Sequence, residues 1–286
     1  MKISTEIESA SAIIGEERAI EELAKAGFDA WDFSMFRMCK YDWSNQKMVE
    51  SDHPIAKDDY LKFARKLKKI GLDNGIYCNQ SHAPFPTFCK EIESYMKRAI
   101  ECTAEAGGKI CVIHPHDLGD IKENAEMYYS LLPFAKQYGV KIATENMWRW
   151  DNDKDRSYAC ACSRPETFNE LIDTINDEFF VACLDIGHAE MRDSGIGAVE
   201  TIKGMGNRIK ALHIHDNDKW HDSHQIPFSM DLDFVSIMKA LKEIGYQGDL
   251  TLEANKYLKN HKDNVFKGIE DLANSAKKLR EIYEKI

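Results

Sequence analysis

The sequence lacks the features of a membrane-spanning, secreted or dinucleotide-binding protein. No apolar run approaches the length that crosses a bilayer, and residues 1–5 lead into a strand-like segment without a signal-peptide pattern. No Gly-x-Gly-x-x-Gly follows a first strand, and no glycine-rich loop is suited to a phosphate group. We therefore expect a cytoplasmic protein, and nothing in the sequence requires a nucleotide or a phosphorylated ligand.

Disulfide-forming cysteine patterns are also missing. The chain has 8 cysteines, but Cys78, Cys111 and Cys183 sit inside strand-like runs and are predicted to be small buried hydrophobic residues of a reduced protein. Cys160 and Cys162 form a C-x-C pair in a polar loop, which is not the C-x-x-C of redox proteins. A soft-metal or redox role for this pair is the minor alternative.

An excess of positive charge is the third absence. With 38 Lys and Arg against 48 Asp and Glu, the net charge is 38 − 48 = −10. That balance provides no general attraction to nucleic acid or to an anionic membrane, although a local basic groove is compatible with it. The expected partner is a small molecule, and the sequence leaves open whether the chain forms a homo-oligomer.

Strand-like and helical segments alternate along the whole chain. Apolar residues recur at helical spacing between short apolar runs, and helices between successive strands make a sheet parallel. Eight such units in 286 residues predict an α/β fold, a (β/α)8 TIM barrel, with residues 1–286 as one domain. An open doubly wound sheet is the alternative. The expected strands are 2–6, 30–34, 74–80, and runs ending at 114, 145, 185, 215 and 253; the expected helices are 16–26, 58–70, 87–105, 122–138, 165–175, 197–205, 233–244 and 265–286.

Five of the strand-like runs stop on a side chain that can bind a metal. They end at His114, Glu145, Asp185, His215 and Glu253. A buried charged group needs compensation, and the carboxyl ends of barrel strands meet at one mouth. Glu145, Asp185, His215 and Glu253 are therefore predicted to share one divalent cation at least. This oxygen and nitrogen set suits zinc or manganese first, with cobalt, magnesium or iron as alternatives.

Further histidines follow the same strands. His82 comes after the third strand, His188 lies three residues after Asp185, and His224 follows Asp222 in the loop after the seventh strand. Together with His114 these residues are candidates for additional metal ligands. His116, His213 and His221 are expected to be ordinary hydrogen-bonded histidines, because His215 lies closer to the mouth than His213.

The segments Glu145-Asn146-Met147, Asp185-Ile186-Gly187-His188, His215-Asp216-Asn217-Asp218 and Asp222-Ser223-His224 resemble those of the xylose isomerase-like TIM barrel superfamily. That group includes sugar phosphate isomerases, ketose 3-epimerases, inosose dehydratases and apurinic-site endonucleases (AP endonuclease family 2, the endonuclease IV type). The resemblance extends over nearly the whole chain. It is fairly specific for the superfamily and poorly specific for the reaction.

The ketose-epimerase branch implies a metal-dependent isomerase or epimerase of a sugar or polyol-like molecule. Glu145 and Glu253 would exchange a carbon-bound proton through an enediolate that the cation stabilises, and His188 would hydrogen-bond a substrate oxygen. The chain departs from that branch after His215, since Lys219 and Trp220 stand where those enzymes carry an arginine.

Residues at the expected mouth suggest how a sugar would bind. Aromatic side chains suit the apolar faces of a sugar, and basic ones could hold a phosphate or carboxylate. The predicted substrate-binding residues are His82, His114, His188, Trp148 and Lys219; other mouth candidates are Trp31, Phe36, Trp43, Trp150, Trp220, Arg149 and Arg156.

The endonuclease IV branch offers a different function, a multi-zinc phosphodiesterase. Its nine ligands for three zinc ions would correspond to His82, His114, Glu145, Asp185, His188, His215, Asp222, His224 and Glu253. Phosphodiester recognition needs loops rich in Lys and Arg, whereas residues 151–156 and 216–222 are weighted toward acids. A dehydratase or lyase on the same barrel, and a barrel that only binds a ligand or partner, are the remaining alternatives.

Overall fold

Parallel strands alternate with helices along the chain, and the strands close into a ring. The computed structural model describes residues 1–286. The barrel strands are β1 (Ile3–Thr5), β2 (Ala30–Ser34), β5 (Tyr77–His82), β6 (Ile110–Val112), β7 (Lys141–Glu145), β10 (Phe180–Asp185), β11 (Ile209–His213) and β12 (Leu250–Leu252). They pair in the order β11-β10-β7-β6-β5-β2 and β1-β12, and isolated parallel bridges Glu6–Asp32 and Ile214–Leu252 join the two groups. The predicted (β/α)8 barrel is confirmed.

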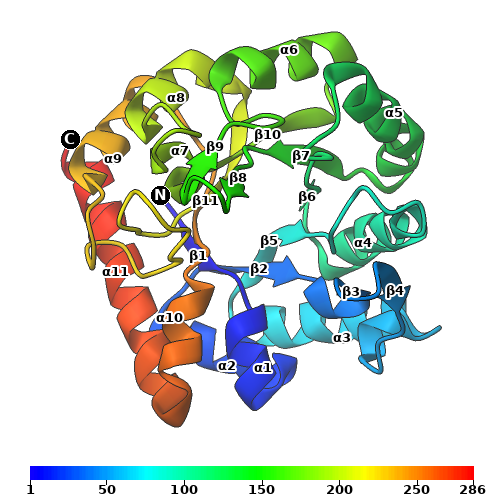
Figure 1. The fold of residues 1–286 in the computed structure, drawn as a ribbon. Coiled ribbons are helices and arrows are strands. Elements are labelled where there is room, and N and C mark those ends of the chain that lie inside the picture. Colours follow the sequence, from blue (N-terminus) through cyan, green and yellow to red (C-terminus); the bar gives the residue numbers. More distant parts are fainter.

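Helices surround the strands (Figure 1), and α11 packs against both α2 and α9. The outer ring consists of α2 (Glu16–Ala26), α3 (Tyr60–Asp73), α4 (Ile92–Ala106), α5 (Ile121–Tyr138), α6 (Pro165–Ile175), α8 (Ala198–Met205), α9 (Phe234–Glu243) and α11 (Val265–Lys285). Shorter helices are α1 (Glu8–Ile14), α7 (Ile186–Glu190), α10 (Asn255–Asn260), and the 3-10 helices η1 (Phe36–Met38), η2 (Pro54–Ala56), η3 (Gly206–Arg208) and η4 (Lys262–Asn264). No helix combines the length and apolarity that crossing a membrane requires.

Local sequence signals account for several helix ends. Asp120 and Glu123 form a capping box at the start of α5, and Gly139 ends that helix with a left-handed φ of 64°. Pro165 occupies the first turn of α6, where its missing N–H costs nothing. The bounds predicted for α2 and α6 are those observed.

Two antiparallel hairpins were not expected from the sequence. β3 (Lys40–Asp42) pairs with β4 (Lys47–Val49), and β8 (Arg149–Asp151) pairs with β9 (Arg156–Tyr158). Each turn begins with an aspartate, Asp42 or Asp151, whose carboxylate accepts backbone N–H groups two and three residues ahead. Short polar strands lack the apolar alternation that predicts a strand, so turn chemistry was the only signal.

Strand alternation places the polar strand ends above a small apolar layer. Ala143, Val181, Cys183 and Ala211 belong to a buried cluster separate from the main core between strands and helices. Since alternate residues share a face, the side chains that follow them by two positions lie on the same side, toward the mouth. The barrel interior therefore ends in a polar layer.

Candidate metal centre

Four buried ligand-type side chains converge at the carboxyl ends of the strands. Glu145, Asp185 and His213 are the last residues of β7, β10 and β11, and Glu253 follows β12. Each offers one atom to a group whose atoms all lie within 4.8 Å of one another. His213 Nδ1 is 3.0 Å from Glu145 Oε1 and 3.6 Å from Glu253 Oε2. We call these four residues the quartet.

The imidazole of the quartet comes from His213, whereas sequence reasoning assigned that place to His215. The strand register explains the difference: Asp185 is paired with His213, so these two side chains lie at the same level of the barrel. His215 lies beyond the end of β11, one pleat farther out. Its Nε2 is still 3.2 Å from Asp185 Oδ1, so it touches the edge of the quartet.

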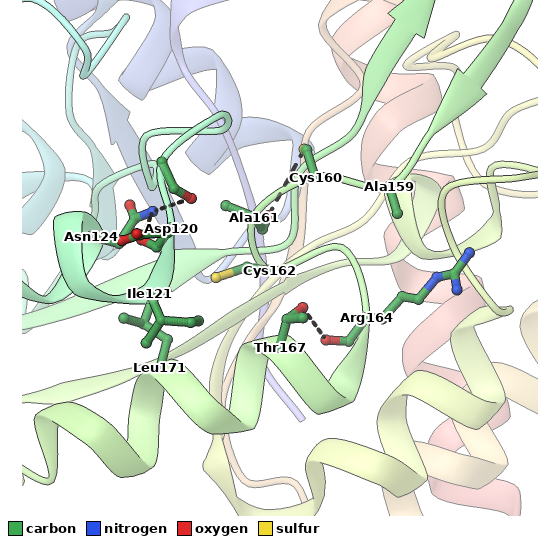
Figure 2. Close-up of a pocket in the computed structure, with 11 residues that line it drawn as sticks. Asp120, Ile121, Asn124, Ala159, Cys160, Ala161, Cys162, Arg164, Thr167 and Leu171 are labelled. Atoms are coloured by element: carbon green, nitrogen blue, oxygen red, sulfur yellow. Dashed lines mark hydrogen bonds between the residues drawn. The ribbon is translucent and has the colours of Figure 1, made fainter.

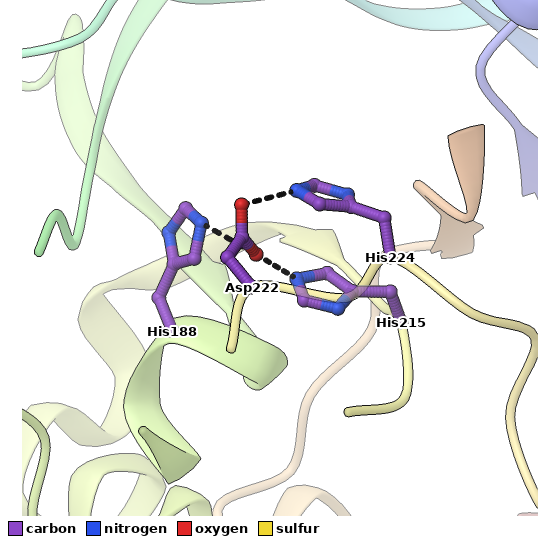
Figure 3. Close-up of side chains that lie close together, drawn as sticks. All are labelled: His188, His215, Asp222 and His224. Atoms are coloured by element: carbon purple, nitrogen blue, oxygen red, sulfur yellow. Dashed lines mark hydrogen bonds and ion pairs between the residues drawn. The ribbon is translucent and has the colours of Figure 1, made fainter. Parts of the chain in front are cut away.

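His215 belongs to a second group, with His188, Asp222 and His224 (Figure 3). The Asp222 carboxylate lies between the three rings. Its Oδ1 is 3.5 Å from His188 Nε2 and 3.4 Å from His215 Nε2, and its Oδ2 is 2.9 Å from His224 Nε2. We call this the outer group. The sequence identified His188, Asp222 and His224 as additional ligand candidates, and the structure brings them together.

The other carboxylate oxygen of Glu145 faces a third group. Oε2 is 3.4 Å from His82 Nε2 and 3.2 Å from His114 Nε2, and the two ring nitrogens are 2.9 Å apart. Glu145 thus belongs to both the quartet and this histidine pair. All nine residues that the sequence proposed as ligands, with His213 added, lie in one continuous cluster.

Backbone carbonyls orient several of these rings. His82 Nδ1 donates to Ala83 O at 2.8 Å, His188 Nδ1 to Asn146 O at 2.8 Å, and His224 Nδ1 to Glu253 O at 2.7 Å. A carbonyl can only accept, so Nδ1 carries a proton, and the neutral form of each ring directs its Nε2 lone pair inward. Outer hydrogen bonds of this kind are typical of metal-binding histidines.

Charges within the cluster compensate one another. Burial by itself raises the pKa of Glu145, but His213, His114 and His82 hold it well below its usual range. Burial opposes a charge on His224, yet Asp222 raises the pKa of that imidazole to about 9. Because a cation must displace such protons, we expect cation binding to release protons and to weaken as the pH falls.

The residues fit a divalent cation. Buried atoms without a hydrogen-bond partner occur in each part of the cluster: Glu145 Oε2, Asp185 Oδ2, His215 Nε2 and Asp222 Oδ1. Unpartnered buried polar atoms are rare in native proteins. Here His215 Nε2 and Asp222 Oδ1 lie 3.4 Å apart, and Glu145 Oε2 lies within ion-pair distance of the rings of His82 and His114. Carboxylate and imidazole donors of this mixture suit zinc, manganese, cobalt or iron.

Comparison with known proteins agrees with the barrel fold. The sequence matches the family model described as "Xylose isomerase-like TIM barrel" over residues 20–282. The chain belongs to this family. The resemblance inferred from the strand-end motifs is thereby confirmed.

The chain is similar in sequence to an uncharacterized protein and in fold to sugar epimerases of known structure. The uncharacterized protein MJ1311 of Methanocaldococcus jannaschii is 24% identical over 262 residues, which cover 85% of this chain and 80% of that protein. A D-tagatose 3-epimerase-like protein has 21% identity and a TM-score of 0.68, covering 96% of this chain and 98% of that one. A D-psicose 3-epimerase has 15% identity and a TM-score of 0.73, covering 99% of both chains. At these identities the structures establish the shared fold.

In this xylose isomerase-like barrel, Trp148 and Lys219 were also predicted to bind substrate, and the structure places them differently. The ring centroid of Trp148 is 6.3 Å from that of His188, at the edge of the outer group. Lys219 instead forms an ion pair with Glu190 at 3.3 Å. Next to the histidine pair, Phe36 contacts His82 and Phe85 stacks on His114, with centroids 4.7 and 5.3 Å apart.

Two supporting residues were not identified from the sequence. Asn146 Oδ1 accepts the Asp185 N–H at 2.7 Å, and its Nδ2 donates to Asp185 O at 2.9 Å, which fixes the backbone of a ligand. Asp32, inside β2, contacts His213. A carboxylate within a strand-like run was the available signal for Asp32, but unlike the predicted ligands it does not end its run.

A pocket lies apart from the three groups of candidate ligands, between the start of α5, the loop before α6 and α6 itself (Figure 2). This pocket of about 480 Å³ is lined partly by Cys160 and Cys162. Burial raises the pKa of the Cys160 thiol to about 11 and that of Cys162 to about 12. Both are therefore neutral near pH 7, which does not favour thiolate chemistry or soft-metal binding.

Replacing Gly187 is expected to disturb the outer group. A Cβ at this position of α7 would overlap the His215 imidazole, whose neighbours are buried. We expect Gly187→Ala to destabilise the protein by about 1–3 kcal/mol, as overpacking does, and to weaken cation binding by the outer group. Denaturant unfolding and metal titration measure the two effects. In a His215→Ala background the destabilisation should largely vanish; an equal cost there would contradict the overlap.

Proposed function

We propose that this protein is a divalent-metal-dependent isomerase or epimerase of a sugar or polyol-like small molecule. The observation that carries the proposal is the quartet: two glutamates, an aspartate and a histidine from four different strand ends approach one another closely enough to share a cation. Membership in the xylose isomerase-like family and the likeness in fold to sugar 3-epimerases support the same reading.

Glu145 and Glu253 are the proposed catalytic residues. Both approach His213 Nδ1, so their carboxylates lie close together at the mouth of the barrel. A bound cation would supply positive charge that stabilises negative charge developing on substrate oxygens. One glutamate would remove the proton from the carbon next to a carbonyl, and the other would return a proton to that carbon. Burial within the cluster keeps both carboxylates positioned and limits the access of water.

Substrate binding is assigned to the residues that surround these carboxylates. Trp148 lies next to His188, and the rings of Phe36 and Phe85 lie next to His82 and His114. Imidazoles can hydrogen-bond sugar hydroxyls, and aromatic faces suit the apolar faces of a sugar ring. Lys219 is a weaker candidate than the sequence suggested, because its ammonium is paired with Glu190.

Metal analysis followed by a ketose panel tests the proposal. We expect the purified protein to contain at least one equivalent of zinc or manganese, and we expect conversion of a ketose to its epimer or isomer. Treatment with a chelator should abolish the conversion, and the readded cation should restore it. A protein that binds neither cation, or that converts no sugar with either bound, would remove this function.

A multi-metal phosphodiesterase is the second candidate, and one specific observation favours it. Beyond the quartet, the outer group and the pair His82 and His114 each gather ligands at metal-binding spacing. Phosphodiester recognition, however, needs free positive charge at the mouth. The loop cations are paired with acids: Arg149 with Asp117, Lys154 with Asp151, Arg156 with Asp193 and Lys219 with Glu190.

We therefore expect no cleavage of DNA that contains an abasic site, even at low salt with zinc in excess. Incubation of the zinc-loaded protein with a labelled abasic duplex, resolved by gel electrophoresis, checks this. The His224→Ala variant is the matched control, because it removes an outer-group ligand. Cleavage by the wild-type protein that His224→Ala abolishes, together with three bound zinc ions, would make the phosphodiesterase the better assignment.

A further inference from the structure

A chain of hydrogen-bonded side chains crosses the barrel interior beneath the quartet. Ser4 Oγ donates to Asn79 Oδ1 at 2.8 Å, and Asn79 Nδ2 donates to Thr251 Oγ1 at 2.9 Å. Thr251 Oγ1 in turn donates to Gln80 Oε1 at 3.4 Å, and Gln80 Nε2 donates to Asp32 Oδ2 at 2.9 Å. Barrel interiors are usually filled by apolar layers, so a polar chain at this depth requires a reason.

The direction of this chain is fixed at Gln80. Its Nε2 also lies 3.3 Å from the carbonyl oxygen of Leu212, which can only accept. The amide nitrogen must therefore face Leu212 O, and its second hydrogen points to Asp32. Asp32 Oδ2 consequently accepts from Gln80, and the same oxygen is 3.4 Å from His213 Nε2. An oxygen in this setting accepts the His213 N–H as well.

The His213 ring is thus oriented oppositely to the neighbouring imidazoles, because its Nε2 rather than its Nδ1 donates the outer hydrogen bond. His82, His188 and His224 donate through Nδ1 to backbone carbonyls and direct Nε2 inward. His213 donates through Nε2 to a side-chain carboxylate, and its Nδ1 faces Glu145 at 3.0 Å. A carboxylate partner makes the ring a stronger electron donor than a neutral carbonyl does. A side-chain carboxylate, unlike a backbone carbonyl, can also be removed by mutation.

We propose that Asp32, oriented by Gln80, is a positioning residue that keeps the proton of His213 on Nε2 and so sets the cation affinity of the quartet. This inference rests on the proposed function in one respect, namely that the quartet binds a cation. Asp32, His213 and Gln80 are 0%, 1% and 3% exposed, so water cannot replace the contact. The second oxygen of Asp32 has no hydrogen-bond partner, which leaves Gln80 and His213 as the polar contacts of this carboxylate.

Manganese titration of the full-length protein tests the assignment, with Asp32→Ala and Asp32→Asn as variants. His213→Ala identifies which binding step belongs to the quartet. We expect Asp32→Ala to weaken that step about 10- to 100-fold and Asp32→Asn to weaken it less, because the amide oxygen can still accept. Asp249→Asn is the control: it removes a half-buried carboxylate that accepts a hydrogen bond from Tyr77 at the opposite end of β12 from Glu253, and should leave the step unchanged.

A second measurement separates positioning from a merely structural role. In ¹⁵N-histidine spectra of the zinc-loaded protein, we expect the His213 proton on Nε2, and we expect Asp32→Ala to alter that signal while the signals of His188 and His224 persist. A folded Asp32→Ala protein with wild-type affinity, or a zinc-loaded wild type with the proton on Nδ1, would overturn the inference. If Asp32→Ala does not fold, Asp32→Asn carries the same comparison.

Different results would contradict the proposed function and the positioning role of Asp32. A wild-type protein that binds neither manganese nor zinc at the quartet removes the proposed function. Spectra of the metal-free protein then still decide whether Asp32 orients His213, because Asp32→Asn must change the His213 signals and Asp249→Asn must not. Unchanged His213 signals in Asp32→Asn would overturn the positioning role in that case.

Discussion

Replacing either Glu145 or Glu253 by glutamine is expected to reduce conversion of ketoses by about 10²- to 10⁴-fold, the usual contribution of a positioned acid or base. Glutamine keeps the size of the side chain but cannot take up a proton. It also removes one negative charge from a group that holds His213 between the two glutamates. The effect should therefore appear mainly in kcat, with cation affinity weakened as well.

Steady-state kinetics at saturating cation, with metal content measured on the same samples, separates these contributions. Glu190→Gln is the matched control, because Glu190 lies near the mouth but pairs with Lys219 outside the ligand groups. Substrate labelled with deuterium at the reacting carbon provides an independent readout, since exchange with solvent should cease in both active-site variants. Turnover near the wild-type level in Glu145→Gln and Glu253→Gln would rule out the two-carboxylate mechanism.

His213→Ala and His215→Ala are expected to differ sharply. Removal of His213 takes away a ligand of the quartet, so the loss of cation affinity should exceed the roughly 10- to 100-fold effect of an outer partner, and ketose conversion should fall with it. Removal of His215 affects the outer group and leaves the nitrogen of the quartet in place. We expect that variant to retain most of its ketose conversion.

Cation titration followed by thermal unfolding distinguishes the two variants without reference to a substrate. A ligand present at about 1,000 times its Kd stabilises the folded state by about 4 kcal/mol, so the wild type and His215→Ala should gain stability from manganese while His213→Ala gains much less. The reverse order would return the quartet to the composition expected from the sequence, with His215 as its imidazole.

The fold and most of the side chains that cluster at the strand ends could be predicted because they depend on local patterns. Short apolar runs, their spacing and the helices between them define the strands, and the residue that ends each run is visible in the sequence. The choice between His213 and His215 could not be predicted in this way. It depends on the register between β10 and β11, which places Asp185 beside His213 and is a property of the folded sheet.

Asp32 and the two hairpins illustrate other limits of the sequence. Asp32 lies in the middle of β2, and only the crossing of several strands brings it to His213 and Gln80. The hairpins β3–β4 and β8–β9 consist of polar strands held by aspartate-initiated turns, so the apolar alternation used to find strands was absent. Lys219 was singled out by its place in the chain, but the ion pair with Glu190 depends on the packing of α7.

Glu145 touches histidines of two groups, Asp185 touches two rings of the outer group, and this sharing has a consequence for divergence within such barrels. A substitution at a peripheral ring leaves either carboxylate with partners that remain, so ligands can be lost one at a time while the central strands keep their compensation. A lineage could thereby move from several ions to a single one through viable intermediates. The number of histidines that a related barrel retains would then indicate how many ligands its lineage has lost.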